Sequence, residues 1–185
     1  MRAIWTRLAL GTAALALALA SGSVSAQFSS NPCPVSGDFV TGGGFIIPPN
    51  STTGDHANFG VAGGCKKELL WGHLEYVDHN FSPPRRVHGT EVLQYWADSS
   101  DPTKTKTRWI GGRAEVNGVA GYFYCVKVTD NGQGASADAD TFQIFLSNGP
   151  NFYTASGPLM GGNIQIHNPD SSTPTDNCLH LLPIA

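Results

Sequence analysis

Chemically active side chains gather in one stretch of the chain, Leu70–Gly89. This stretch holds three of the six histidines, His73, His79 and His88. In an extended strand, alternate side chains lie on the same face, so His73, Glu75 and His79 share one face of a predicted strand. Imidazole and carboxylate groups bind zinc and related transition metals. The stretch is therefore the first candidate for a metal site.

Two more histidines, His88 and His167, could complete this site from neighbouring strands. The competing interpretation is a solvated strand face on which histidines alternate outward. We favour that interpretation because no closely spaced cysteines or helical ligand pairs accompany the histidines, as they do in many zinc sites. A metal-dependent enzyme that uses His73, Glu75 and His79 is accordingly the least favoured function.

A second candidate site is the acidic segment from Asp130 to Asp140. Asp130, Asp138 and Asp140 supply carboxylate oxygens, which calcium prefers as ligands. Their spacing does not match an EF-hand loop, and Asp, Asn and Gly are also the residues that tight turns need. We therefore expect a turn here. The sequence predicts no cofactor, with calcium or zinc as the alternatives.

Three tryptophans are candidate binding residues. Trp71, Trp96 and Trp109 lie on or near predicted strands, and exposed aromatic rings on a sheet stack well on sugars or apolar partners. Packed inward, the same rings would be part of the core. An exposed line of two or more of them favours a binding module, and a filled interior with scattered aromatics favours a structural one.

Alternating apolar residues predict strands along most of the chain, as at Phe142, Ile144 and Leu146. Asn117-Gly118 is a strong signal for a two-residue hairpin turn. The predicted strands lie in Val40–Ile47, His56–Ala62, the part of Leu70–Gly89 that precedes a turn at Asn80–Arg86, Val87–Trp96, Trp109–Val116, Tyr122–Asp130, Phe142–Leu146 and Asn151–His167. This pattern predicts an all-β fold of about eight antiparallel strands, mostly a meander, closed as a barrel or folded as a sandwich.

The first and last predicted strands share a feature that bears on closure. Both carry glycines beside isoleucines, in the segments TGGGFII and GGNIQIH. We expect these two strands to pair, because pairing removes exposed sheet edges.

The N-terminus reads as a secretory signal peptide. Arg2 and Arg7 precede an apolar run, Leu8–Ala20, and Val24-Ser25-Ala26 is a small-residue cleavage site. The run is shorter than the roughly 20 residues of a membrane-spanning helix. The predicted organisation is then a signal peptide at 1–26, an N-terminal extension at 27–38, a single β domain at 39–168 and a C-terminal tail at 169–185 that is tied back by a disulfide.

The chain has four cysteines, which fit an oxidising compartment. Their wide spacing argues against a structural zinc site, and four cysteines allow three pairings. We favour Cys33–Cys178, which would join the two tails beside the domain, and Cys65–Cys125, which would join a strand end to a strand.

The charge of the chain excludes one class of partner. Lys and Arg number 11 against 14 Asp and Glu, for a net charge of −3. No basic patch is available to follow a phosphate backbone, so we expect no nucleic acid partner. The sequence also lacks the motifs of serine hydrolases, zinc proteases and P-loop enzymes.

Several short motifs, in this order, resemble a known family. VTGGGFI, ANFGV, GHLEYVDH with VHG shortly after, VTDNG followed by DTFQI, and GGNIQIH are similar to a bacterial secreted domain found alone or after choice-of-anchor domains. The resemblance covers about Val40 to His167. It implies an extracellular bacterial β domain with no established catalytic role. The cysteine-bearing extensions and the long segment after Asp130 depart from the family pattern.

Together these features predict a secreted, non-catalytic β domain. It would act as a structural or interaction module at the cell surface or in the matrix, with a glycan or an extracellular protein as its partner. A carbohydrate- or small-ligand-binding module is the alternative function.

Overall fold

The computed structural model describes residue 33 and residues 37–49, 51–134 and 137–183. The predicted signal peptide, residues 1–26, lies outside the described residues, as does most of the predicted N-terminal extension. The regular secondary structure of the described residues is β structure, apart from a single 3-10 turn, η1, at Leu179–Leu181. The predicted all-β class is confirmed.

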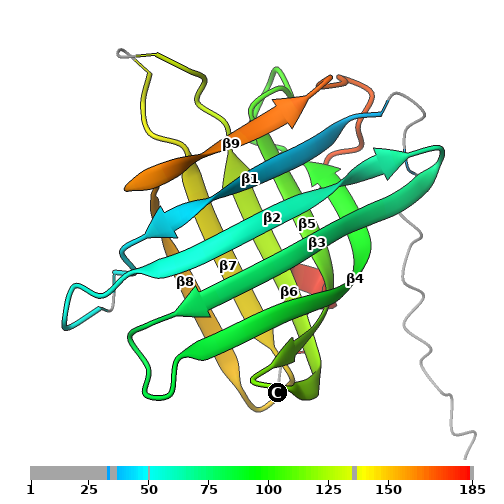
Figure 1. The fold of residues 1–185 in the computed structure, drawn as a ribbon. Coiled ribbons are helices and arrows are strands. Elements are labelled where there is room, and N and C mark those ends of the chain that lie inside the picture. Colours follow the sequence, from blue (N-terminus) through cyan, green and yellow to red (C-terminus); the bar gives the residue numbers. More distant parts are fainter. Residues whose placement is uncertain (1–32, 34–36, 50, 135–136, 184–185) are drawn as a thin grey trace, which may run out of the picture.

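Nine antiparallel strands form a single sheet that curls into a half-barrel (Figure 1). The strands are β1 (Phe39–Ile46), β2 (Ala57–Lys66), β3 (Leu69–Asp78), β4 (Arg85–Ala97), β5 (Thr107–Val116), β6 (Val119–Thr129), β7 (Thr141–Ser147), β8 (Phe152–Pro158) and β9 (Gly161–His167). Their order across the sheet is β8-β7-β6-β5-β4-β3-β2-β1-β9, so the sheet is a meander with one exception. The exception is β9, which pairs with β1 as expected for the first and last strands.

The segment predicted as one final strand is in fact two strands. β8 pairs with β7 at one edge of the sheet, and β9 pairs with β1 at the other edge. Two backbone hydrogen bonds fix the link between them. Leu159 N–H donates to the carbonyl of Asp140, just before β7, and Met160 N–H donates to the carbonyl of Phe45 in β1. The chain therefore crosses from one sheet edge to the other within two residues, which periodicity alone does not reveal.

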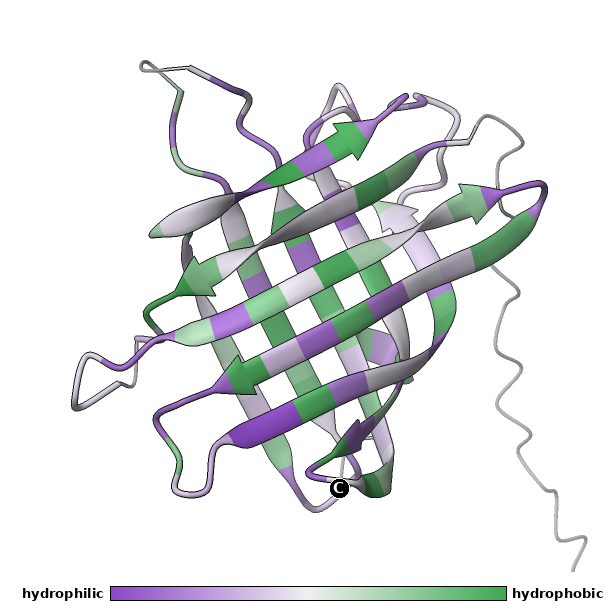
Figure 2. Cartoon of the chain, in the orientation of Figure 1, coloured by the Kyte–Doolittle hydropathy of each residue, from purple (hydrophilic) through white to green (hydrophobic). Residues whose placement is uncertain are grey.

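Apolar and polar side chains alternate along the strands (Figure 2). The inward-facing residues form one continuous core with members from every strand. Phe59 of β2 stacks on Phe142 of β7 with ring centroids 4.0 Å apart. These strands are not neighbours in the sheet, so this contact crosses the interior and shows that aromatic side chains fill it.

A buried ion pair closes one end of the interior. Arg108 and Asp38 are both fully buried, and Arg108 Nη2 lies 2.7 Å from Asp38 Oδ2. The Tyr95 hydroxyl donates to the same carboxylate over 2.7 Å, and the Thr173 hydroxyl donates to it over 2.6 Å. Thr173 belongs to the C-terminal tail, so we call this the tail end of the half-barrel.

The four cysteines form two disulfides, but in a different pairing from the predicted one. Cys33 bonds Cys65, and Cys125 bonds Cys178. Cys65 faces the main core, whereas Cys125 and Cys178 belong to a separate apolar cluster on the outer face of the sheet. A bond between Cys65 and Cys125 is impossible because their side chains lie on opposite faces of the sheet. The C-terminal tail is still tied back, through Cys125 of β6.

Candidate binding and metal sites

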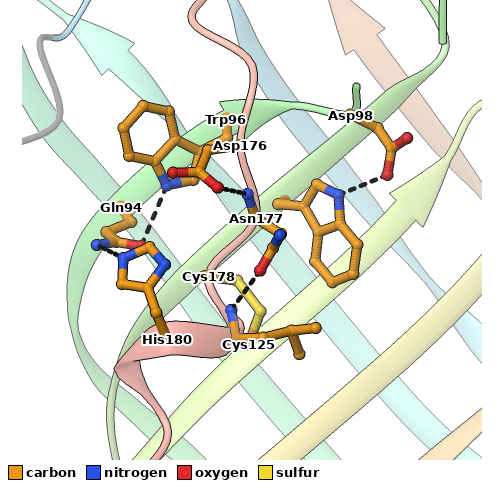
Figure 3. The surroundings of a disulfide bond; sticks show 10 residues. Gln94, Trp96, Asp98, Cys125, Asp176, Asn177, Cys178 and His180 are labelled. Carbon is orange, nitrogen blue, oxygen red and sulfur yellow. Dashed lines mark hydrogen bonds between the residues drawn. A yellow bond between two sulfur atoms is a disulfide. The ribbon is translucent and has the colours of Figure 1, made fainter. Parts of the chain in front are cut away.

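Two of the three candidate tryptophans pack against the C-terminal tail, and Figure 3 shows Trp96 beside Asn177 and Cys178 of the tail. Trp96 and Trp109 are 7% and 8% exposed and pack with the Cys125–Cys178 disulfide and with Leu181. Their indole N–H groups are satisfied by acceptors nearby, Gln94 Oε1 for Trp96 and Asp98 Oδ2 for Trp109. These rings form an outer core under the tail, and they do not offer their faces to a sugar.

Trp71 is more accessible but lies apart from the other two. Its ring is 5.6 Å from that of Phe39, and its indole nitrogen is buried without a hydrogen-bond partner. The three tryptophans therefore form no exposed line.

The acidic segment between β6 and β7 stabilises the edge of the sheet. Asp140 Oδ2 accepts the Ile164 N–H over 2.7 Å, and Asp130 Oδ2 accepts the Ile166 N–H over 2.9 Å. Both amides belong to β9, an edge strand whose outer N–H groups have no neighbouring strand. Asp138 is exposed, and among the described residues these three aspartates form no group that could hold an ion. Asp130 and Asp140 therefore serve as hydrogen-bond acceptors for the free edge of β9.

Two of the three residues first predicted as metal ligands, His73 and Glu75, lie together, and His88 takes the place of His79 beside them. Ligand atoms of His73, Glu75 and His88 all lie within 4.8 Å of one another on the outer face of β3 and β4. His79 does not join them, because it lies just past the end of β3, where its ring contacts His56 and bonds the side chain of Asn58.

His167 is also absent from the cluster. It bonds the Thr41 hydroxyl over 2.9 Å and stacks on Phe39. Its place on β9 puts it across β1 and β2 from β3 in the sheet order.

Two adjoining pockets lie at the end of the half-barrel opposite the tail end. The β1–β2, β3–β4, β5–β6 and β7–β8 connections meet there, so we call it the hairpin end (Figure 1). One pocket has a volume of about 490 Å³ and is lined by Arg85 and Tyr122, among others. The second has about 410 Å³ and is lined by Ser51, Asn80 and Phe81, among others. Phe152 and Tyr153 of β8 line both pockets.

Arg85 lines the first pocket and contacts two aromatic rings. Its guanidinium carbon is 4.0 Å from the ring centroid of Phe81 and 4.1 Å from that of Tyr153. Asp78 is its paired residue on β3, but the Asp78 carboxylate accepts hydrogen bonds from Tyr153 Oη and Asn80 Nδ2. No carboxylate in the described part of the chain forms an ion pair with Arg85.

Three polar atoms around the pockets are buried without a hydrogen-bond partner. They are Ser51 Oγ, Asn80 Oδ1 and Arg85 Nη1, and Trp71 Nε1 is the only other such side-chain atom among the described residues. Each unpaired buried group costs about 1–3 kcal/mol of stability. Such groups are rare in folded proteins and tend to mark a functional position. Ser51 and Asn80 line the second pocket, and Arg85 lines the first, which shares Phe152 and Tyr153 with it.

A chain of hydroxyl groups runs behind the pockets. Tyr76 Oη donates to Tyr153 Oη over 2.6 Å, and Tyr153 Oη donates to Asp78 Oδ2 over 2.6 Å. Burial raises the pKa of both tyrosines well above the ordinary value of 10.0. Both phenols therefore stay neutral and keep the Asp78 carboxylate occupied, which leaves Arg85 without that partner.

The sequence carried little signal for this site. Its residues come from the β1–β2 loop, the β3–β4 turn and strands β4 to β8, and none of them follows a recognisable motif. Arg85 and Phe81 fall in a segment whose prolines indicate only a turn. A pair of adjacent arginines at the start of a strand is the one local hint.

Neither the models of protein families, nor the curated proteins, nor the solved structures contain a match to this chain. Among the described residues, no helix is both long enough and apolar enough to span a membrane.

Proposed function

We propose that this protein is a secreted, non-catalytic module that binds an acidic sugar at the hairpin end. The observation that carries the proposal is the group of three unpaired polar atoms beside two pockets. Arg85 Nη1 requires an acceptor, Asn80 Oδ1 requires a donor, and Ser51 Oγ can bond either. A ligand that carries both a carboxylate and hydroxyl groups satisfies all three.

The walls of the pockets fit the body of such a ligand. Phe152 and Phe81 are 61% and 39% exposed, unusually high fractions for phenylalanine. Aromatic rings stack on the apolar faces of sugar rings, as they do on other apolar partners. The two pocket volumes also lie in the range of roughly 300–1,000 Å³ that is common for small-molecule sites.

The contacts of Arg85 favour a charged ligand over a neutral one. The rings of Phe81 and Tyr153 contact the guanidinium, and they leave its edge at Nη1 without a hydrogen-bond partner. A carboxylate meets such an edge with charge-assisted bonds, which are about twice as strong as neutral ones.

Two observations support an extracellular location. Both disulfides belong to an oxidising compartment, and the N-terminal sequence has the features of a signal peptide. The motif order that resembles the bacterial secreted family supports the same compartment. A structural module without a ligand is the competing proposal.

Isothermal titration calorimetry with glucuronate and galacturonate tests the proposal. Glucose and galactose serve as neutral controls, and hexanoate serves as a carboxylate without hydroxyl groups. We expect measurable binding of at least one acidic sugar and much weaker binding of all three controls. Absence of heat with both acidic sugars would refute the proposed ligand class.

A matched pair of variants locates the binding site. Arg85→Gln should weaken binding of the acidic sugar about 10- to 100-fold, because a hydrogen bond to a charged group contributes about 1.5–3 kcal/mol. Arg86→Gln removes the same charge from the next residue, which is exposed on the opposite face of β4, and should leave affinity unchanged. Equal loss in both variants would place the ligand elsewhere.

A further inference from the structure

A second site lies on the outer face of the sheet, where β3 and β4 bring three metal-ligand side chains together. Glu75 and His88 are paired residues of these antiparallel strands, and His73 precedes Glu75 by two residues on the same face. One ligand atom from each of the three residues lies within 4.8 Å of the other two. A single ion can therefore contact all three residues.

The Glu75 carboxylate already lies between the two imidazoles. Its Oε1 atom is 2.5 Å from His88 Nδ1 and 3.3 Å from His73 Nε2. In a tetrahedral zinc site, bonds of about 2.0–2.1 Å place neighbouring ligand atoms roughly 3.3 Å apart. The His73–Glu75 distance matches this spacing, and a rotation of His88 would lengthen its distance to Glu75 towards the same value. That rotation is free to occur, because the His88 side chain is 54% exposed.

We propose that His73, Glu75 and His88 bind one divalent ion of the zinc, copper or nickel group. Two imidazole nitrogens and one carboxylate oxygen suit these ions, whereas calcium and magnesium favour sites made of oxygen atoms alone. Three protein ligands leave at least one coordination position open to water or to a ligand from a partner. The site is independent of the sugar proposal, because it faces outward from the sheet whereas the pockets lie at one end of the interior.

The neighbouring charges are compatible with a bound cation. Glu115 of β5 pairs with His88 and adds a carboxylate on the same face. Arg86 pairs with Val77 and adds a positive charge on that face. These two charges oppose one another, so the affinity of the site depends mainly on its three ligands.

Titration of the secreted, disulfide-bonded protein with zinc chloride tests this site, using a preparation without a histidine tag. We expect one ion per chain by calorimetry and a higher Tm in the presence of zinc, because an ion that binds only the folded state stabilises it. Losing even a group that supports a ligand weakens metal affinity about 10- to 100-fold. His73→Ala, Glu75→Gln and His88→Ala should therefore each weaken zinc binding by at least about tenfold.

His79→Ala is the matched control, since it removes an exposed histidine just past the end of β3, outside the site. Zinc affinity should be unchanged in this variant. Copper(II) provides an independent measurement, because the paramagnetic resonance spectrum of the bound ion reports its nitrogen ligands. That spectrum should lose one nitrogen in His73→Ala and in His88→Ala. Absence of zinc binding, or equal weakening in His79→Ala and His88→Ala, would overturn the proposal.

Discussion

The two ends of the half-barrel each place an arginine against the interior, and the two arginines have opposite surroundings. At the tail end, Arg108 is fully buried and bonds the Asp38 carboxylate through Nε and Nη2. At the hairpin end, Arg85 contacts two aromatic rings, and its Nη1 atom is buried without a hydrogen-bond partner. The guanidinium group of Arg108 is thus paired with a carboxylate of the protein, whereas that of Arg85 keeps a nitrogen atom without a hydrogen-bond partner.

This difference indicates which end is structural and which is available for binding. Asp38 accepts bonds from Arg108, Tyr95 and Thr173, so it joins β1, β4, β5 and the C-terminal tail. A buried polar network whose hydrogen bonds are all formed stabilises one particular arrangement of the chain. The hairpin end instead keeps three unpaired polar atoms beside its pockets, an arrangement that a ligand can complete.

The largest expected effect is at the tail end. Asp38→Asn removes the charge that compensates Arg108 and should lower the free energy of unfolding by about 3–5 kcal/mol. Denaturation in urea measures this change. Glu91→Gln breaks the exposed Glu91–Arg113 pair, whose side chains are about half exposed, and should cost less than about 1 kcal/mol. Equal effects in the two variants would contradict a structural role for the tail end.

Removal of the outer disulfide should have the next largest effect. Cys125→Ala combined with Cys178→Ala should cost about 4 kcal/mol, because the closed loop spans 53 residues. The variant should also release the tail from Trp96 and Trp109 and shift tryptophan fluorescence to longer wavelength. Cys33→Ala with Cys65→Ala is the control, and it should destabilise the protein without this shift. A tail that stays in place without its disulfide would refute the prediction.

A smaller effect is expected from the titration of Asp98, which lies beside the tail (Figure 3). Burial alone would raise the pKa of its carboxyl group, but hydrogen bonds from Lys127, Ser100 and Trp109 outweigh it and lower the pKa from 3.8 to about 2. The ionised form is therefore favoured by folding. Its contribution to stability is complete above the ordinary pKa and is lost as pH falls from 3.8 towards 2.

The contribution of Asp98 can be separated from that of other acids by comparison with Asp98→Asn. In urea denaturation, the stability difference between the wild type and the variant should be largest above about pH 5 and should shrink as pH falls towards 2. A difference that is constant over this range would show that the Asp98 pKa is not lowered by folding.

The smallest effect on stability is expected at the hairpin end. Arg85→Gln should change the free energy of unfolding by less than about 1 kcal/mol, because the lost cation–π contacts are offset by removal of an unpaired buried charge. Thermal and urea denaturation measure this change. A loss as large as that of Asp38→Asn would mean that Arg85 is a structural residue, and the contrast between the two ends would disappear.

The strands and their faces follow from local sequence. Leu74 and Tyr76 alternate with polar residues and are buried in the core as the alternation predicts. Asn117 and Gly118 adopt φ values of 50° and 79°, the positive angles that a tight hairpin turn requires. Pairing of the first and last strands was also foreseeable from the glycines and isoleucines that they share. The expected removal of sheet edges does not follow from it, because β8 and β9 remain the two edges of the sheet.

The sites depend on contacts between distant residues and could not be predicted in the same way. His88 joins His73 and Glu75 because the β3–β4 register places it opposite Glu75, whereas His79 leaves that face where β3 ends. The disulfide pairing depends on which face of the sheet each cysteine occupies once the sheet curls.

The sequence by itself therefore determined the β class, most strand positions, the pairing of the first and last strands and the presence of an outward histidine face. Period-two alternation and turn residues are local properties, so they can be recognised without a structure. Only the tertiary structure decided the cysteine partners, the third metal ligand and the unpaired edge of Arg85. Each of these is set by strand register and sheet curvature, which bring together residues that lie far apart along the chain.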